Sequence, residues 1–134
     1  MCGILLHISK ENKSFVNSLN DLQKRGPDCQ SIEVVNYDGK IITVGHTRLG
    51  IIDVNNPDSN QPLVSENNLL TFNGEIYNYK ELAKTYFPNK SFCSDSILLF
   101  EFLKEYPDKI TELKGMFAFC FLDLTKGTCI IVSD

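Results

Sequence analysis

The chain has 134 residues, a formal net charge of −4 and 43% hydrophobic residues. This length suits one domain with its own hydrophobic core. The acidic balance argues against nucleic acid and anionic membranes as partners, because both bind basic faces. No apolar run reaches the roughly 18–20 residues of a membrane span, and we see no signal-peptide pattern at the N-terminus. We therefore expect a cytoplasmic protein with no membrane partner.

Cysteine usage supports the same compartment. The five cysteines are scattered and include no C-x-x-C pair, which is typical of reduced proteins rather than of disulfide scaffolds. The two histidines, His7 and His46, lie far apart, so we expect no metal site.

The first half of the chain predicts a strand, a helix and a hairpin. Residues 3–8 form a short apolar run typical of a buried strand, in which His7 is expected to pack rather than to catalyse. Apolar residues then recur at helical spacing behind Ser14, a candidate N-cap, up to a stop signal after residues 24–25. Residues 32–35 and 41–44 flank Asp38-Gly39, which favours a type I′ turn.

The second half predicts further strands, two helices and a final hairpin. Residues 61–64 and 68–72 resemble strand ends on either side of a polar turn. A helix is expected over residues 78–86 with Asn78 and Glu81 as a capping pair, and another begins after Ser94 and stops before Pro107. Residues 116–122 and 128–132 form a hairpin apolar enough to be covered on both faces. The fold class is α+β, with helices packed on largely antiparallel sheets.

Cys2 is the first candidate for chemistry. If Met1 is removed, Cys2 carries a thiol and a free α-amine, and so supplies both a nucleophile and a general base. The alternative is a small buried residue at the start of a strand, and position alone favours that alternative.

Arg48 lies among apolar neighbours where a strand gives way to a loop. A buried guanidinium needs an anion. An internal ion pair with Asp28 or Asp53 and a bidentate fork for a ligand carboxylate are equally good interpretations of the spacing.

Asn73-Gly74-Glu75 has two interpretations as well. Asn-Gly between apolar runs is a strong hairpin signal, yet the residues that follow move quickly into helical periodicity. The functional alternative is an oxyanion hole made by the Asn73 side-chain amide and the Gly74 N–H.

Two further polar motifs have simple structural explanations. Ser94-Asp95 can cap a helix and complement its dipole, or it can place Asp95 opposite a ligand ammonium group. Residues 25–28 (Arg-Gly-Pro-Asp) can be a helix stop followed by a turn.

Taken in order, these motifs resemble the glutaminase domain of glutamine-hydrolysing asparagine synthetases, a class II glutamine amidotransferase. The resemblance covers nearly the whole chain. Arg48-Leu49 followed by Ile51-Ile52-Asp53 resembles the asparagine-synthetase branch of the class. The matching segments are Met1-Cys2-Gly3-Ile4, residues 25–28, 46–49 and 51–53, Gln61-Pro62, residues 73–78, Ser94-Asp95 and residues 115–119.

The resemblance implies a four-layer αββα sandwich of the N-terminal-nucleophile hydrolase type. It also implies hydrolysis of L-glutamine to glutamate and ammonia through a thioester on Cys2, with no metal or cofactor in this step. The implied catalytic residues are Cys2, Asn73 and Gly74. The implied substrate-binding residues are Arg48 for the α-carboxylate, Glu75 and Asp95 for the α-amino group, and also Ile51, Ile52 and Gly74.

The resemblance also indicates what this chain does not contain. The family's domain continues past residue 134, so we expect residues 1–134 to be a glutaminase domain whose C-terminal strands are missing, leaving an uncovered sheet edge. We also expect residues 1–134 to contain no synthetase domain, which would use ATP and Mg²⁺ to accept the ammonia. Two alternatives stay open: a non-catalytic glutamine-binding module, and a glutaminase serving a different acceptor. Homo-oligomerisation is left open as well.

Overall fold

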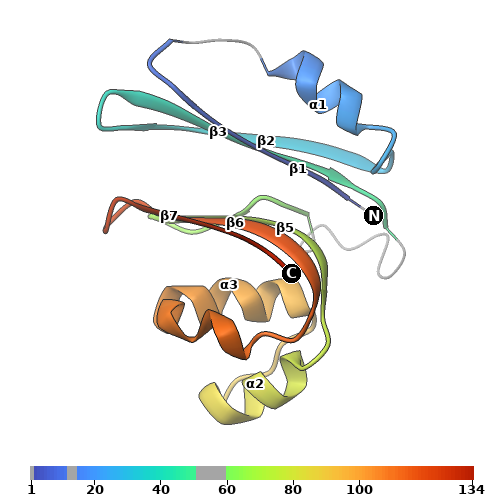
Figure 1. Ribbon diagram of the computed structural model, residues 1–134, viewed down its shortest axis with the longest axis vertical. Helices are drawn as coiled ribbons and strands as arrows, with labels where there is room; N and C mark the ends of the chain where they lie inside the picture. The colour runs from blue at the N-terminus through green and yellow to red at the C-terminus, as the bar shows by residue number, and fades with distance from the viewer. Residues whose placement is uncertain (1, 12–14, 51–59) are drawn as a thin grey trace.

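The computed structural model describes residues 2–11, 15–50 and 60–134. Within these ranges two antiparallel sheets face each other between helices (Figure 1). The first sheet has the order β1-β3-β2, with β1 Gly3–Ser9, β2 Cys29–Tyr37 and β3 Lys40–Arg48. The second has the order β4-β5-β6-β7, with β4 Leu63–Val64, β5 Asn68–Ile76, β6 Gly115–Asp123 and β7 Thr128–Ser133.

Helices cover the outer faces of both sheets. Helix α1 (Val16–Leu22) lies on the first sheet, while α2 (Tyr79–Tyr86) and α3 (Asp95–Glu105) lie beyond the second (Figure 1). A 3₁₀ helix, η2 (Pro107–Glu112), connects α3 to β6. The expected four-layer αββα sandwich is confirmed. None of the helices in the described ranges has the length and apolar character needed to span a bilayer.

The predicted β2–β3 hairpin is confirmed and is longer than expected. Asp38 and Gly39 have φ values of 48° and 69°, and a type I′ turn requires positive φ at both central residues. The register pairs Tyr37 with Lys40 at the turn and continues to Cys29 opposite Arg48. The hairpin therefore ends with Arg48, one of the predicted substrate-binding residues, as the last residue of β3.

Helix ends follow the sequence signals unevenly. Ser94 caps α3 as predicted, since its Oγ accepts a hydrogen bond from the Ile97 N–H at 3.3 Å. Asn78 is the N-cap residue of α2, as predicted, but its side chain makes no capping hydrogen bond. Its side chain reaches the chain before β6, where it accepts from the Lys114 N–H and donates to the Glu112 carbonyl, both at 2.9 Å. Ser14 lies outside the described residues.

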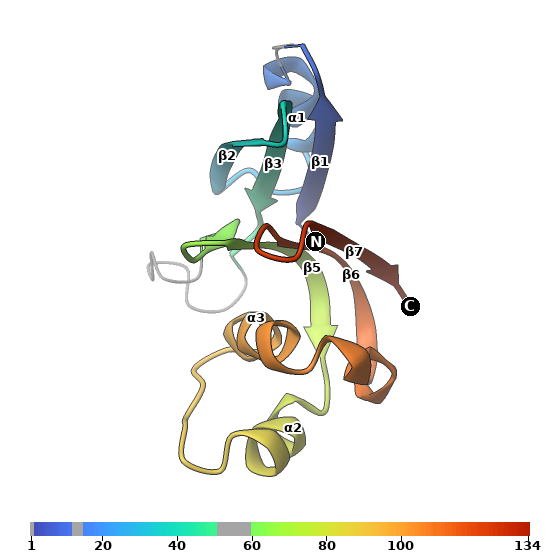
Figure 2. The same cartoon turned by 90° about the vertical axis from the view of Figure 1, so that its left-hand side faces the viewer.

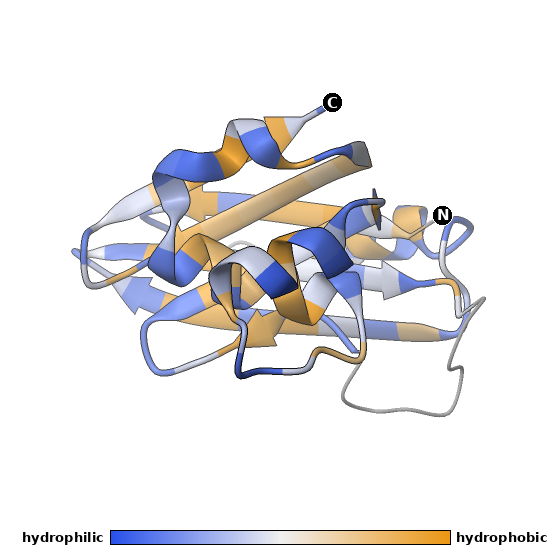
Figure 3. Ribbon diagram, turned by 90° about the horizontal axis from the view of Figure 1, so that it is seen from below, coloured by the Kyte–Doolittle hydropathy of each residue, from blue (hydrophilic) through white to orange (hydrophobic). Residues whose placement is uncertain are grey.

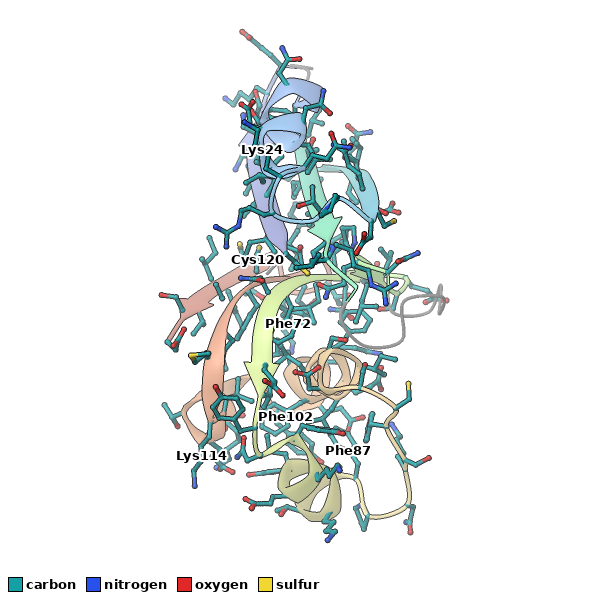
Figure 4. The ribbon with its side chains drawn as sticks, turned by 90° about the vertical axis from the view of Figure 1, so that its right-hand side faces the viewer. Lys24, Phe72, Phe87, Phe102, Lys114 and Cys120 are labelled. Carbon is teal, nitrogen blue, oxygen red and sulfur yellow. The ribbon has the colours of Figure 1, made fainter. Side chains whose placement is uncertain are left out.

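The larger apolar core lies between the second sheet and helices α2 and α3. Alternate residues of β5 and β6 point into it, and Phe102 of α3 is fully buried at its centre. Phe72, Phe87 and Phe102, labelled in Figure 4, all belong to this core. The orange apolar segments in Figure 3 run along the same strands and helices.

The seam between the two sheets has a smaller apolar core and several buried polar groups. Figure 2 shows the first sheet meeting the second at one end, so the two overlap only in part. Here, the seam means the layer between the sheets at this end. Its apolar residues are Ile42, Val44, Leu69, Cys120 and Leu122, and its buried polar residues include His46, Arg48, Gln61 and Thr71.

Strand β7 differs from the expectation that both faces of the final hairpin are covered. Ile130 and Val132 pack against the larger core, but Ile131 on the opposite face is 70% exposed. The reason is topological. β7 is an edge strand that lies beyond the part of the second sheet covered by the first (Figure 2). The expectation holds for β6, where residues 117 and 119–123 are buried.

Candidate functional site

Cys2 lies at the seam, directly before β1, and touches the middle of β5. Its backbone N–H donates a hydrogen bond of 2.8 Å to Asn73 Oδ1, joining residues 71 positions apart in the chain. Because an N–H can only bind the amide oxygen, this bond fixes the orientation of the Asn73 side chain and turns Nδ2 away from the Cys2 nitrogen. The sequence-predicted nucleophile and the predicted oxyanion donor are therefore neighbours.

Other polar contacts hold Cys2 in place. The Leu49 N–H donates to Cys2 Sγ at 3.5 Å, and Arg25 Nε donates to the Cys2 carbonyl at 3.2 Å. Thr47, which is fully buried, accepts from the Gly3 N–H at 3.1 Å and donates to the Leu22 carbonyl at 3.0 Å. Thr47 of β3, Leu49 directly after β3 and Arg25 after α1 therefore hold residues 2–3 against the first sheet.

Arg48 reaches the same end of the seam because β1 and β3 run antiparallel, with Gly3 opposite Thr47. Its side chain is only 8% exposed, and Nη1 donates to Asn60 Oδ1 at 3.1 Å. The carboxylate of Asp28 accepts from the Gly50 N–H at 2.7 Å, which ties the end of β3 to the turn after α1.

Gly74 occupies a position that other residues would not tolerate. Its φ of 138° lies in the region that favours glycine, and a Cβ there would overlap the Met116 carbonyl and lie 2.6 Å from Phe117 Cα. Asn73-Gly74 is part of strand β5 rather than a turn, so the hairpin alternative is wrong. The glycine is explained by the approach of β6.

The Gly74 N–H is not used by the β5–β6 ladder. Gly74 pairs with Phe117. The Phe117 N–H donates to Asp134 Oδ1 at 2.9 Å, and its carbonyl accepts from the Asp134 N–H at 3.0 Å. Both backbone groups of Phe117 therefore face the chain end beyond β7, which makes Gly74–Phe117 a non-hydrogen-bonded pair.

Gln61 and His46, which were not among the predicted site residues, bind the backbone of Phe72, the residue before Asn73. Gln61 Oε1 accepts from the Phe72 N–H at 2.6 Å. His46 hydrogen-bonds the Phe72 backbone, and burial lowers the pKa of His46 from 6.5 to about 4, with the Arg48 charge acting in the same direction. His46 is 2% exposed, and its Nε2 has no partner among the described residues. Both residues lie in segments that match the family, and this match was the one sequence feature that could have pointed to them.

Asp95 and Glu75 are brought together at the end of β5. Asp95 Oδ2 accepts from the Ile76 N–H at 2.9 Å, while Oδ1 accepts from the Ser96 N–H at 2.8 Å. Burial raises the pKa of Asp95, and the nearby Glu75 carboxylate raises it further, against the effect of these hydrogen bonds. A cation bound beside these two carboxyl groups would offset the repulsion that Asp95 experiences from Glu75.

The remaining predicted residues, Ile51 and Ile52, lie outside the described residues, as does Asp53. Among the residues described, no group of three or more His, Cys, Asp or Glu side chains is placed to hold a metal ion. The candidate site thus has a thiol, an amide, a backbone N–H and a guanidinium at one end of the seam, and a carboxyl pair at the end of β5.

An αββα sandwich with a cysteine at its N-terminal end in the seam has the architecture of the N-terminal-nucleophile hydrolases. The chain belongs to the glutamine amidotransferase domain family, whose model matches residues 1–134.

Similar proteins are named as glutamine-hydrolysing asparagine synthetases. A putative asparagine synthetase of Methanocaldococcus jannaschii is 31% identical over all of this chain and 30% of its own length. A probable asparagine synthetase of Acanthamoeba polyphaga mimivirus is 37% identical over 92% of this chain and 24% of its own length. Asparagine synthetase B of Escherichia coli K12 is 33% identical over 84% of this chain and 20% of its own length. The chain therefore spans less than a third of each of these relatives.

Proposed function

We propose that this chain hydrolyses L-glutamine to glutamate and ammonia, with Cys2 as the nucleophile after removal of Met1. The observation that carries the proposal is the 2.8 Å hydrogen bond from the Cys2 nitrogen to Asn73 Oδ1. Because the amide oxygen of Asn73 faces the Cys2 nitrogen, Nδ2 is left for another acceptor, which supports its proposed role as an oxyanion donor. Membership of the glutamine amidotransferase domain family supports the same reaction.

The reaction begins with transfer of the thiol proton to the Cys2 α-amine. The sulfur then attacks the carbonyl carbon of the glutamine side-chain amide, and the negative charge moves to the amide oxygen. Asn73 Nδ2 and the Gly74 N–H are the proposed donors to this oxyanion. The protonated amine returns its proton to the leaving nitrogen, ammonia departs, and water hydrolyses the γ-glutamyl thioester to glutamate and free thiol.

Charged groups at the two ends of the site suit the α-carbon of glutamine. Arg48 is the proposed partner of the α-carboxylate, because a guanidinium matches a carboxylate bidentately. Glu75 and Asp95 are the proposed partners of the α-ammonium group, which would relieve the repulsion between these two carboxyl groups. Ile51 and Ile52 are proposed as further substrate-binding residues.

The ammonia is proposed to pass to a synthetase unit, which would use ATP and Mg²⁺ to make asparagine from aspartate. The names of the relatives support this acceptor. ATP and Mg²⁺ would be bound by that unit and not by residues of this chain.

Affinity labelling followed by intact mass measurement tests the glutaminase proposal. A diazo-ketone analogue of glutamine is expected to add once to a chain that has lost Met1, and excess glutamine is expected to slow the addition. Cys2→Ala should abolish both labelling and ammonia release. Cys93→Ala, which removes an exposed thiol outside the predicted site, should leave labelling and ammonia release intact.

Retention of Met1, or a folded chain that is not labelled, would contradict the proposal. Labelling without hydrolysis of glutamine would favour the binding-module alternative. Adding a synthetase unit with aspartate, ATP and Mg²⁺ to this chain then tests the acceptor, because asparagine is expected as the product.

A further inference from the structure

Two cysteines outside the proposed glutaminase site lie next to each other on β6 and β7. Cys120 Sγ and Cys129 Sγ are 3.9 Å apart. Cys120 is 4% exposed and belongs to the apolar cluster of the seam, whereas Cys129 is exposed. Figure 4 shows Cys120 where the two sheets meet. One thiol of the pair is therefore accessible and the other is held beneath it.

The sheet register explains why the two side chains meet. Cys120 is opposite Ile131, and Cys129 is opposite Leu122, so the cysteines are diagonal neighbours on one face of the hairpin. Diagonal neighbours have Cα atoms about 7–8 Å apart in an average antiparallel pair, although their side chains still reach each other. A relaxed disulfide prefers a Cα separation of about 4.4–6.8 Å and an S–S bond of about 2.05 Å.

We propose that Cys120 and Cys129 form a dithiol modification site that a small-molecule disulfide oxidises to an intrachain disulfide. The Cys129 thiolate attacks one sulfur of the small disulfide, forms a mixed disulfide and releases one thiolate. Cys120 then gives up its proton, and its sulfur attacks Cys129 Sγ and expels the second thiolate. In total the two cysteines lose two electrons and two protons, and the small disulfide becomes two thiols.

The surroundings of the two sulfurs set this order of events. Burial, reinforced by the neighbouring Cys129 sulfur, raises the pKa of Cys120 to about 12. Cys120 therefore stays protonated while the exposed Cys129 meets the reagent. The sulfurs must also close by about 1.9 Å to bond. A bridge across this diagonal is strained, so we expect it to be reduced more readily than an unstrained structural disulfide.

Oxidation of the folded full chain with glutathione disulfide, followed by alkylation after unfolding and peptide mapping, tests the site. We expect one bridged peptide pair containing Cys120 and Cys129, and alkylation at three of the five cysteines instead of five. Addition of excess glutathione should restore alkylation at both positions. Phenylarsine oxide, which bridges neighbouring thiols with loss of water, should protect the same two residues from alkylation without any oxidant.

Matched variants separate the pair from general thiol chemistry. Cys129→Ser changes an exposed side chain and should abolish both the bridge and the arsenical protection. Cys93→Ser, which removes another exposed thiol, should preserve both. The proposal is overturned if Cys120 and Cys129 stay separately alkylated, if either one bridges a different cysteine, or if chain unfolded in urea forms the same bridge in equal yield. None of these outcomes depends on Cys2 or on glutamine hydrolysis.

Discussion

The two faces of the second sheet are built for different purposes. The face toward α2 and α3 is closed by phenylalanine and leucine side chains, with Phe102 and Phe119 almost fully buried. The face toward the first sheet has a smaller apolar cluster and buries His46, Arg48 and Gln61 beside it. The second sheet thus separates the larger apolar core, which we call the support layer, from the seam with its buried polar residues.

This difference indicates where stability and chemistry reside. Apolar burial is the dominant favourable term in folding. Buried polar groups contribute little net stability, but they hold defined positions because each needs a specific partner. Strand β5 belongs to both regions, since Phe72 enters the larger core while Asn73 faces Cys2. Substitutions on the two faces should therefore separate folding from catalysis.

The largest effect is expected from Phe102→Ala in the support layer. Emptying this buried position should lower the free energy of unfolding by about 3–5 kcal/mol, measured by urea denaturation. Tyr77→Ala removes an aromatic side chain that is 58% exposed and should change stability by no more than about 0.5 kcal/mol. Glutaminase activity per folded Phe102→Ala molecule should stay close to that of the original chain. A large fall in kcat would contradict the idea that the two faces of the sheet serve folding and catalysis separately.

Asn73→Ala tests the seam. If Asn73 is the proposed oxyanion donor, its loss should lower kcat for glutamine by about 100- to 1,000-fold, with the folded fraction nearly unchanged in the same urea titration. Asn68→Ala, at the other end of β5, is the matched control and should retain activity. Equal losses of activity in the two variants would show that the strand, rather than the amide at position 73, is responsible.

His46 gives the seam a pH dependence. Its pKa is lowered in the folded state to about 4, so between pH 4 and 6.5 the unfolded chain binds more protons than the folded one. Stability contributed by neutral His46 is therefore present above the unfolded pKa and is lost as pH falls. The expected loss is about 2 kcal/mol between about pH 7 and about pH 5, measured by urea denaturation at each pH.

A His46→Gln variant isolates this contribution. The side chain introduced at position 46 does not titrate, so the free energy of unfolding of this variant should fall less steeply between about pH 7 and about pH 5. Asp95 acts in the opposite direction, because its raised pKa makes the folded chain bind protons more readily as pH falls. This effect is common to both proteins and cancels in the comparison. Parallel stability profiles for the two proteins would contradict the assignment to His46.

The smallest effect is expected at the cap of α3, which joins the support layer to the site. Ser94→Ala removes the acceptor for the Ile97 N–H and should cost about 1 kcal/mol of folding stability. Because Asp95 follows directly, the KM for glutamine should rise modestly. Ser91→Ala, in the preceding exposed loop, should alter neither quantity.

Much of the architecture could be predicted from local patterns. The Asp38-Gly39 turn and the Ser94 cap each depend on neighbours in sequence, and both were confirmed. The side-chain cap predicted at Asn78 and the covering of β7 on both faces were wrong for a common reason. The Asn78 side chain binds residues 34 and 36 positions away, and the exposure of Ile131 depends on which strand lies at the sheet edge.

The sequence by itself determined the residue types of the candidate site, because thiol, amide, guanidinium and carboxyl groups can be recognised in order along the chain. Only the tertiary structure decided how they meet. The antiparallel pairing of β1 with β3 brings Arg48 to the end of the seam where Cys2 lies, and stacking of the sheets puts Cys2 against Asn73. These are contacts between distant segments, and packing fixes them, whereas turns and caps are fixed by the residues beside them.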